Sequence, residues 1–430
     1  MRRVIPFAGD ALAAGAVLCA SAAGEYLFYE DAEGVSLAEG ELARVEVYRD
    51  RVSLVNSGSR RDFPVHGTPL ATAGSVLREV GGRAYGWVAF ELCLDSAGGE
   101  LARFLLPRRE IRISGGEATL HAATVAELDD LERRLGDTTA TPLPGERIEV
   151  DTRDHGAAAY EKSVLAALDE IHAGNLDKVI LSRSVPVPGD LDLPATYLAG
   201  RRANDPARSF LLRLGGWEAA GFSPEIVARV TASGTVTTQP LAGTRALTGD
   251  EDRDAAALAE LLRDPKEVFE HAVSVRLAAA ELDGLCEPGT VRVTEFMDVR
   301  RRGSVQHLAS RVMGDLRAGV GAWDALTGLF PAVTASGIPK AQACELLHRL
   351  EPGERGLYSG AIVVADSDGA LDAALVLRSL FRHRGETWLR AGAGVVGPST
   401  PARELEETRE KLAAVSRYLV PAAESLRAAS

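Results

Sequence analysis

Most strand-like runs in this chain follow one another directly across short turns, and this order restricts the folds that are open to it. The clearest example is the turn DSDG at 366–369, which separates apolar runs at 361–365 and 371–381 and predicts a β-hairpin. Helix-like segments stand between groups of such runs rather than after every strand. This order favours an α+β fold built on antiparallel sheets and disfavours a doubly wound parallel sheet.

Periodicity and turn residues predict regular elements along the whole chain. Strands are expected at 26–29, 44–48, 85–90, 109–113, 178–187, 210–214, 226–230, 236–238 and 387–396. Helices are expected at 160–171, 255–262, 266–282 and 401–419, the last with Thr400 as its N-cap. Residues 126–150 are charged and contain LPG at 143–145, so they are the best candidate for an internal boundary.

The composition of the 430 residues excludes several classes of protein. Apolar residues make up 46% of the chain, enough for a large core, and the net charge of −13 disfavours nucleic-acid binding. No apolar run approaches the ~18 residues of a membrane span. The four cysteines form no CxxC pair, and residues 11–24 are expected to form a short surface helix rather than a secretion signal. A cytoplasmic protein that does not bind membranes is therefore expected.

Two pairs of carboxylates at helical spacing are the first candidates for a functional site. Glu404 and Glu407 share a face of the expected C-terminal helix with Lys411. Glu267 and Glu270 share a face of the helix at 266–282. One interpretation is two solvated, charged helix faces. The other is that the pairs face each other and form an all-oxygen cage for a hard cation such as Mg²⁺.

Several single residues also carry two interpretations. Lys178 opens an apolar strand, so it is either a strand-end lysine that reaches water or a desolvated general base. Glu225 is either a turn carboxylate or the acid partner of that lysine. Arg378 lies in an apolar run and needs an anion to satisfy its guanidinium group. Gly392 and Gly394 permit a ligand to approach the backbone closely.

Two loops and one histidine complete the candidates. The segments PLAGTR at 240–245 and FPAVTASGIPK at 330–340 are rich in backbone amides and hydroxyls, and such loops can hold carboxylates. His307 is either a hydrogen-bonded core residue or a catalyst, and the sequence alone favours the core residue.

Taken together, these motifs resemble the chorismate-utilising enzymes. The motifs occur in the order of that family between residues 178 and 411, and they are KVILSR, SPE, PLAGTRA, KEVFEHA, GSVQHL, FPAVTASGIPK, RGLYSG, LRAGAG and RELEETREK. The resemblance implies one large α+β domain with two antiparallel sheets flanked by helices and a site in a deep cleft. Residues 1–150 would be its N-terminal part, and residues 151–430 the chorismate-binding catalytic part.

The resemblance also implies a role for each matching residue. Lys178 would activate water for attack on the chorismate ring, Glu225 would protonate the departing hydroxyl, and His307 would complete the catalytic set. Glu270 and Glu407 would bind Mg²⁺ directly, supported by two further carboxylates. The metal residues would thus be Glu267, Glu270, Glu404 and Glu407. The substrate-binding residues would be Gly243, Thr244, Thr334, Tyr358, Leu377, Arg378, Gly392 and Lys411.

Within the family, the salicylate-synthase branch is the one most similar in sequence to three segments of this chain, VTTQPLAGTRA, RRGSVQHLAS and FPAVTASGIPK. That branch implies Mg²⁺-dependent conversion of chorismate to isochorismate and then to salicylate and pyruvate, as in siderophore biosynthesis. Lys178 favours water over ammonia as the nucleophile, so no glutaminase subunit is expected. The run DVRRR at 298–302 departs from the family pattern and adds positive charge near His307.

Two alternatives remain open at this point. The first is an isochorismate synthase that releases its product. The second is a catalytically silent relative that binds chorismate-like anions; the presence of Lys178, Glu225 and all four helix carboxylates argues against it.

Overall fold

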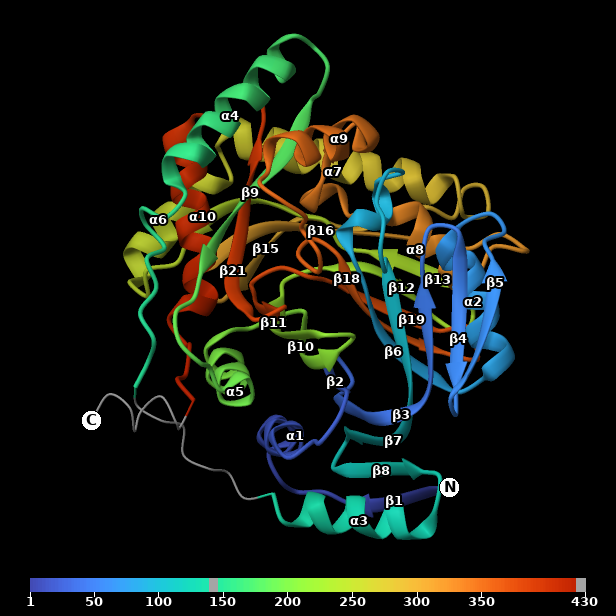
Figure 1. Ribbon diagram of the computed structural model, residues 1–430. Helices are drawn as coiled ribbons and strands as arrows, with labels where there is room; N and C mark the ends of the chain where they lie inside the picture. Colours follow the sequence, from blue (N-terminus) through green and yellow to red (C-terminus); the bar gives the residue numbers. More distant parts are fainter. Residues whose placement is uncertain (139–145, 423–430) are drawn as a thin grey trace.

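The computed structural model describes residues 1–138 and 146–422 (Figure 1). The strands are β1 (Arg2–Pro6), β2 (Tyr26–Glu30), β3 (Val35–Val47), β4 (Arg51–Asn56), β5 (Ser59–Pro64), β6 (Arg83–Val88), β7 (Ala102–Ser114), β8 (Glu117–Ala122), β9 (Lys178–Pro186), β10 (Arg208–Leu214), β11 (Trp217–Ser223), β12 (Ile226–Val230), β13 (Thr235–Thr238), β14 (Leu241–Ala246), β15 (Arg292–Arg302), β16 (Val305–Asp315), β17 (Gly337–Ile338), β18 (Ala361–Asp366), β19 (Leu371–Leu375), β20 (Ser379–His383) and β21 (Glu386–Val395). The helices are α1 (Ala11–Ala20), α2 (Pro69–Val80), α3 (Val125–Gly136), α4 (Ala157–His172), α5 (Leu193–Ala203), α6 (Glu251–Leu261), α7 (Pro265–Asp283), α8 (Ala322–Leu329), α9 (Lys340–Leu350) and α10 (Pro401–Ser416).

The strands of the described residues form one hydrogen-bonded antiparallel sheet, so the expectation of two sheets was wrong. The long strands β3 and β7 pair along their length, with an irregular register between Glu41 and Ala43. On one side of that irregularity β3 also pairs with β2, and on the other side with β4. One limb of the sheet continues from β2 through β10, β11, β20 and β21 to β9. The other continues from β7 through β6, β18 and β19 to β12.

The two limbs enclose a core of large side chains. Tyr29 and Phe210 from one limb pack in the same buried cluster as Trp87 and Ile362 from the other. Burial of side chains of this size is the main favourable contribution to folding. Two sheets and one strongly bent sheet produce the same alternation of apolar residues, which is why the sequence pattern did not distinguish them.

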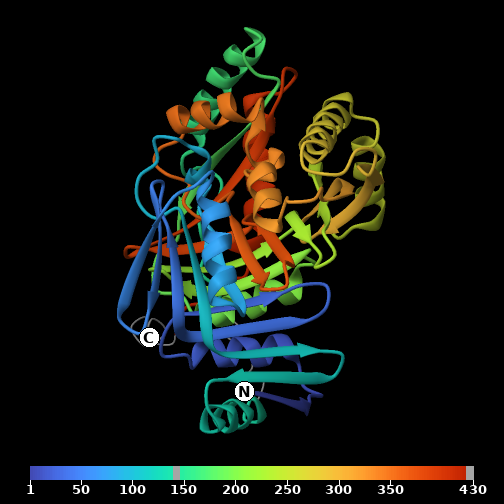
Figure 2. The ribbon, with the colours of Figure 1, turned by 90° about the vertical axis from the view of Figure 1, so that its right-hand side faces the viewer.

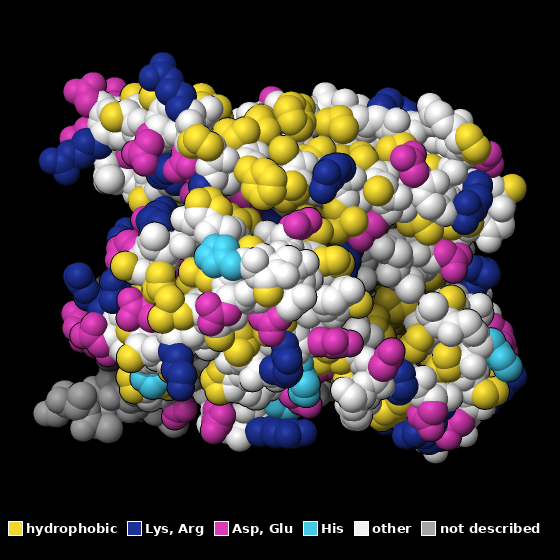
Figure 3. Space-filling view, turned by 90° about the horizontal axis from the view of Figure 1, so that it is seen from above, with side chains coloured by type: hydrophobic (Ala, Val, Ile, Leu, Met, Phe, Trp, Pro, Cys, Tyr) yellow, Lys and Arg dark blue, Asp and Glu magenta, His cyan; other side chains and the backbone are white. Residues whose placement is uncertain are grey.

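Helices cover the outer side of the sheet where the motifs lie. Helices α4 and α10 lie beside each other against β9 and β21, and α7 lies against β14 and β16 (Figure 1). Figure 2 shows α6, α7 and β15 standing together at one side of the molecule. Seen from above, acidic and basic side chains are interspersed around a patch of hydrophobic ones (Figure 3). That face therefore presents no large region of a single charge.

Local signals explain where the two site helices begin. Pro265 stands in the first turn of α7, and the Asp264 side chain caps it by accepting a hydrogen bond from the Lys266 amide, 2.9 Å away. Pro401 begins α10 as expected, but the Thr400 side chain makes no capping hydrogen bond. Only the backbone of Thr400 takes part in the first turn of α10: its carbonyl accepts a hydrogen bond from the Glu404 amide.

Two other expectations need correction or qualification. The run 371–381 is not one strand: β19 ends at Leu375 and β20 starts at Ser379, because Arg378 adopts a left-handed backbone conformation with φ of 50°. Part of the expected boundary at 126–150 is helix α3, which a complete capping box starts. The LPG segment at 143–145 lies outside the described residues.

The N-terminal segment forms a helix as expected, but the helix is not confined to the surface. Leu18 and Cys19 of α1 are buried in a core cluster. All four cysteines lie in the described part of the chain and are free thiols. No helix found there combines the length and the apolar character that crossing a membrane requires.

Candidate active site

A cavity of about 50 Å³ brings together most of the residues expected at a site. Those that line it are Glu225, Gly243, Thr244, Glu270, His307, Thr334, Tyr358, Leu377, Arg378, Gly392, Glu407 and Lys411. A larger cavity of about 1190 Å³ is lined by the other two helix carboxylates, Glu267 and Glu404. The carboxylates of α7 and α10 therefore stand between the two spaces. The smaller space has the richer set of chemically active side chains, although the larger space has more room.

Lys178 is fully buried at the start of β9, so the strand-end interpretation was wrong. Its Nζ lies 2.9 Å from Oε1 of Glu270 and donates a hydrogen bond to Oγ of Ser274 at 3.0 Å. The lysine does not line the small cavity itself and reaches its wall through Glu270. A buried lysine whose nitrogen contacts a single carboxylate and a hydroxyl is the kind of group that can exchange a proton with a bound reactant.

Glu225 lies in the turn between β11 and β12 and is 3% exposed. Its carboxyl group accepts hydrogen bonds from the hydroxyl of Thr334 and, at 3.3 Å, from the amide of Leu241. Burial raises the pKa of Glu225 to about 8, and these hydrogen bonds offset only part of that effect. The group therefore holds its proton at neutral pH, which is the state a general acid needs.

Arg378 is a buried cation that takes part in none of the ion pairs formed by residues 1–138 and 146–422. Its Nη1 donates to the carbonyl of Arg302 at 2.8 Å, and its Nη2 contacts Nε2 of His307. Burial, together with the charge of Arg302, lowers the pKa of Arg378 to about 9. A guanidinium group that faces a cavity without an internal carboxylate fits an anionic ligand.

His307 is bonded on both ring nitrogens. Since the Arg378 guanidinium can only donate, Nε2 of His307 must accept, and Nδ1 is then the nitrogen that donates to Oγ1 of Thr244, 3.0 Å away. Burial and the nearby charges of Arg378 and Lys411 lower the pKa of His307, which keeps the ring neutral. In this arrangement the histidine orients the arginine.

Another part of the cavity wall is formed by Tyr358, Gly392 and Lys411. Nζ of Lys411 lies 2.8 Å from Oε1 of Glu407 and donates to the carbonyl of Gly392 at 2.9 Å. A Cβ atom on Gly392 would lie 3.1 Å from the hydroxyl oxygen of Tyr358 and 2.6 Å from the carbonyl of Leu181. The glycine therefore leaves room for the tyrosine and for strand β9, as well as for any ligand.

The second glycine of the LRAGAG motif approaches a protein group. A Cβ atom on Gly394 would lie 2.2 Å from Oε1 of Glu270. The close approach that was expected for a ligand is thus taken by a carboxylate of α7. The sequence motif identified Gly394, but it did not show that the group approaching this glycine is the carboxylate of Glu270.

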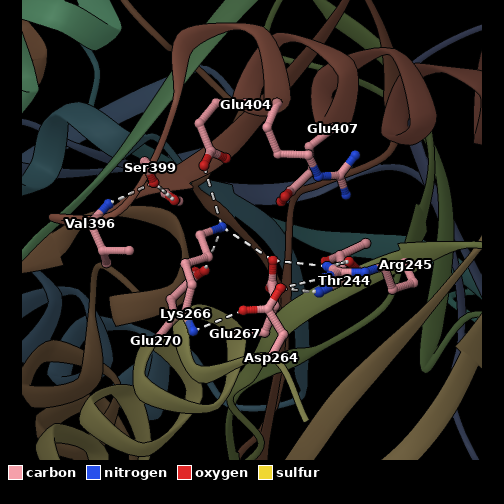
Figure 4. Close-up of polar contacts among 12 residues, drawn as sticks. Thr244, Arg245, Asp264, Lys266, Glu267, Glu270, Val396, Ser399, Glu404 and Glu407 are labelled. Carbon is pink, nitrogen blue, oxygen red and sulfur yellow. Dashed lines mark hydrogen bonds and ion pairs between the residues drawn. The ribbon is translucent and has the colours of Figure 1, made fainter. Parts of the chain in front are cut away.

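The four helix carboxylates are buried, so the interpretation as solvated faces was wrong. Their exposed fractions range from 0% for Glu404 to 5% for Glu270. Figure 4 shows Glu404 and Glu407 pointing from α10 towards Glu267 on α7. Both oxygens of Glu404 and Oε2 of Glu407 are buried without a hydrogen-bond donor. Buried carboxylate oxygens without a hydrogen bond call for a cation, and the ammonium of Lys266 lies 3.3 Å from Oε1 of Glu404.

The PLAGTR loop does hold a carboxylate, and it is the carboxylate of Glu267. The Thr244 amide donates to Oε2 of Glu267 at 3.0 Å, and Nη1 of Arg245 lies 3.0 Å from Oε1. The DVRRR run acts on the site through Arg302, whose carbonyl accepts a hydrogen bond from Arg378 and whose charge lowers the pKa of that arginine. The side chains of Arg300 and Arg302 pair instead with Glu295 and Asp205.

Lys266 is the residue of this cluster that the sequence did not single out. Its Nζ lies 3.3 Å from Oε1 of Glu267, 3.5 Å from Oε2 of Glu270 and 3.3 Å from Oε1 of Glu404 (Figure 4). The only signal in the sequence is that Lys266 directly precedes Glu267 and stands four positions before Glu270.

The carboxylates differ in charge state. Burial and the charge of Glu407 raise the pKa of Glu404 to about 7. Burial also opposes ionisation of Glu407, but Lys411 and Lys266 outweigh it and lower the pKa of Glu407 to about 2. A set made only of carboxylate oxygens suits a hard cation. As they lie, no three acidic, histidine or cysteine side chains of the described chain surround one metal position, and the ammonium of Lys266 stands among the carboxylates.

Comparisons with known proteins agree with this chemistry. The family model described as chorismate binding enzyme matches residues 26–417. The chain is 44% identical over 415 residues to a salicylate synthase of Mycolicibacterium paratuberculosis, a match that covers 94% of this chain and 92% of that protein. It is 39% identical over 260 residues to anthranilate synthase component 1 of Spirochaeta aurantia, which covers 60% of this chain and 54% of that protein.

Solved structures show the same fold. The menaquinone-specific isochorismate synthase of Escherichia coli superposes with a TM-score of 0.74 at 24% identity, over 96% of this chain and 93% of that one. Anthranilate synthase component I of Streptococcus pneumoniae superposes with a TM-score of 0.72 at 24% identity, over 92% of this chain and 93% of that one. The chain therefore belongs to the chorismate-binding enzyme family, as its motif order predicted. Within that family it is a homologue of a salicylate synthase over nearly its full length.

Proposed function

We propose that this chain is a Mg²⁺-dependent salicylate synthase that converts chorismate to isochorismate and then to salicylate and pyruvate. The observation that carries the proposal is that two buried groups stand at one small cavity: the neutral carboxyl group of Glu225 lines it, and Lys178 reaches its wall through Glu270. The near-full-length similarity to a salicylate synthase supports the same activity.

In the first step, water replaces the ring hydroxyl. Lys178, in its neutral amine form, takes a proton from the water molecule that attacks the ring, and Glu225 gives its proton to the departing hydroxyl, which leaves as water. The raised pKa of Glu225 suits this role, because the proton is present before the reaction starts. The reaction is balanced, since one water molecule enters and one leaves.

The two carboxylates of chorismate need separate positive partners. Arg378, oriented by His307, has no internal carboxylate in the described chain and would receive the enolpyruvyl carboxylate together with Tyr358 and the Gly392 backbone. Leu377, Thr334, Thr244 and Gly243 would line the remaining wall. The ring carboxylate of chorismate would then be bound by the cation that the helix carboxylates hold.

The residues present fit Mg²⁺ in their chemistry. Glu270 and Glu407 would bind the ion directly, because they also line the small cavity, and Glu267 and Glu404 would support it from the side of the large cavity. When bound, the ion would offset part of the negative charge of these carboxylates and hold the ring carboxylate of the substrate. The small cavity lies well below the ~300–1,000 Å³ of usual ligand sites, so substrate binding requires side chains between the two cavities to move.

The second step is the loss of pyruvate from isochorismate. It requires that the enolpyruvyl group be held over the ring hydrogen that it takes up. Arg378 and Tyr358 at one end and the carboxylate cluster at the other would fix that conformation. Positioning of this kind accounts for at most about 7–11 kcal/mol of a barrier.

The test is a time course with chorismate and Mg²⁺, followed by chromatography. We expect salicylate and pyruvate in equal amounts, with isochorismate appearing only transiently. Isochorismate that accumulates to equilibrium without pyruvate would instead identify an isochorismate synthase, the main alternative. No turnover with retained chorismate binding would identify a silent relative.

The proposal has three further parts. Residues 151–430 are the catalytic part, since every residue assigned to the site lies in them. Water serves as nucleophile, so no glutaminase subunit takes part. A cytoplasmic location agrees with the free state of the four cysteines.

A further inference from the structure

The ammonium group of Lys266 occupies the centre of the carboxylate cluster. It lies within 3.5 Å of oxygens of three of the four carboxylates, and they come from two different helices, α7 and α10. Figure 4 shows the lysine reaching from α7 towards Glu404 on α10. The lysine side chain thus links the two helices in the way that a bound cation would.

Each of the other three carboxylates pairs with a cation other than Lys266, and Glu404 does not. Glu267 also pairs with Arg245, Glu270 with Lys178 and Glu407 with Lys411. Among the described residues, Lys266 is the only cation within ion-pair distance of Glu404. The neighbouring Arg403 on α10 pairs with Glu410 outside the cluster. Without Lys266, the negative charge of Glu404 would therefore have no cation within ion-pair distance among the described residues.

An ammonium group and Mg²⁺ cannot share this position. Mg²⁺ takes oxygen ligands at about 2.0–2.1 Å in a near-octahedral arrangement, so the carboxylates that bind it must draw together around one point. Nζ of Lys266 stands between those oxygens, and a divalent ion beside it would be repelled. The lysine has space to leave, because it lines the cavity of about 1190 Å³.

We propose that Lys266 is an internal cation that competes with Mg²⁺ for the carboxylate cluster and turns into the large cavity when the metal binds. The lysine thereby sets the affinity for the metal. This inference rests on the metal site of the proposed function, and it concerns a residue to which that function assigns no role.

The test compares Mg²⁺ binding by the full-length protein, stripped with a chelator and dialysed, in isothermal titration calorimetry. Lys266→Met should bind Mg²⁺ at least about tenfold more tightly than the wild type, because a competing charge is removed. Arg403→Met is the matched control, since it removes one positive charge at the same cavity without touching the four carboxylates. Its affinity should change much less.

The outcomes separate this inference from the metal assignment. If wild type binds Mg²⁺ and Lys266→Met binds it no more tightly than Arg403→Met, competition by Lys266 is wrong and the metal site stands. If neither wild type nor Lys266→Met binds Mg²⁺, the metal site and the inference both fall.

A second measurement uses the wild type, in case Lys266→Met does not fold. The chain has five lysines, so acetylation by a water-soluble reagent can be followed at each one by mass spectrometry. We expect Mg²⁺ to increase acetylation of Lys266 several-fold relative to the exposed Lys162. Unchanged or slower acetylation of Lys266 would overturn the proposed displacement.

Discussion

Replacing Gly394 by alanine would place a methyl group against the carboxylate of Glu270. The added Cβ would lie 2.2 Å from Oε1 and 2.7 Å from Cδ of Glu270, whereas Cβ atoms essentially never come within 3.0 Å of a nonbonded heavy atom of another residue. The backbone of Gly394 has an ordinary φ, so the substitution causes no strain of its own. The carboxylate of Glu270 must therefore withdraw by roughly 1 Å, away from Lys178 and from the position of the metal.

The expected effect falls on activity more than on folding. A displacement of 1 Å at a reacting centre can cost about 10²-fold in rate, so kcat/KM for salicylate formation should fall by about that factor. The end of a side chain can move more easily than packed core atoms, so the loss of stability should stay at or below about 1–3 kcal/mol. Salicylate fluorescence measures the rate across a Mg²⁺ titration, and thermal unfolding measures the stability.

Gly397→Ala is the matched control. Gly397 lies three residues further along, its φ is ordinary, and a Cβ there would meet nothing within 4 Å. If Gly394→Ala kept a kcat/KM within about threefold of Gly397→Ala, the steric argument would be refuted. A double-mutant cycle sharpens the test: with Glu270→Ala already present, Gly394→Ala should have little further effect, because its target is gone.

Three further predictions follow from single groups. Lys178→Met should lower turnover by about 10²–10⁴-fold while calorimetry still detects chorismate binding, and near-normal turnover would remove the lysine from the mechanism. Glu407→Gln should weaken Mg²⁺ binding, measured by calorimetry, whereas Glu406→Gln on the exposed side of α10 should not; equal affinities would contradict the assignment of Glu407. The raised pKa of Glu225, about 8 against an ordinary 4.5, means that its contribution to stability is complete below pH 4.5 and is lost as the pH rises towards 8. The free energy of unfolding in denaturant should therefore be similar for Glu225→Gln and the wild type near pH 5. At pH 8.5 the variant should be the more stable of the two by about 4 kcal/mol. A difference that does not change with pH would contradict the raised pKa.

Local elements were predictable where one short-range signal was enough. The turn at 366–369 forms the hairpin of β18 and β19, and Pro265 and Pro401 start α7 and α10 at the expected positions. These features depend on φ preferences and turn chemistry within a few residues. The break at Arg378 was not predictable, because its left-handed backbone carries no signal in an apolar run of strand-forming residues.

The sequence by itself determined the family and the set of chemically active residues. Motif order and spacing pointed to the chorismate-binding enzymes without any structure, and the carboxylates of α7 and α10 were recognised as pairs from helical spacing alone. Spacing shows which side chains share a face but not what covers that face.

Only the tertiary structure decided how those residues are charged and what they touch. Burial gives Glu225 its proton, the contact with Arg378 selects the tautomer of His307, and the meeting of α7 with α10 places Lys266 among three carboxylates. The physical reason is that desolvation and Coulomb interactions depend on distances between groups far apart in the chain. The same reason explains why two expected sheets became one: the pairing of β3 and β7 with several partners is a property of the folded sheet and not of any segment of it.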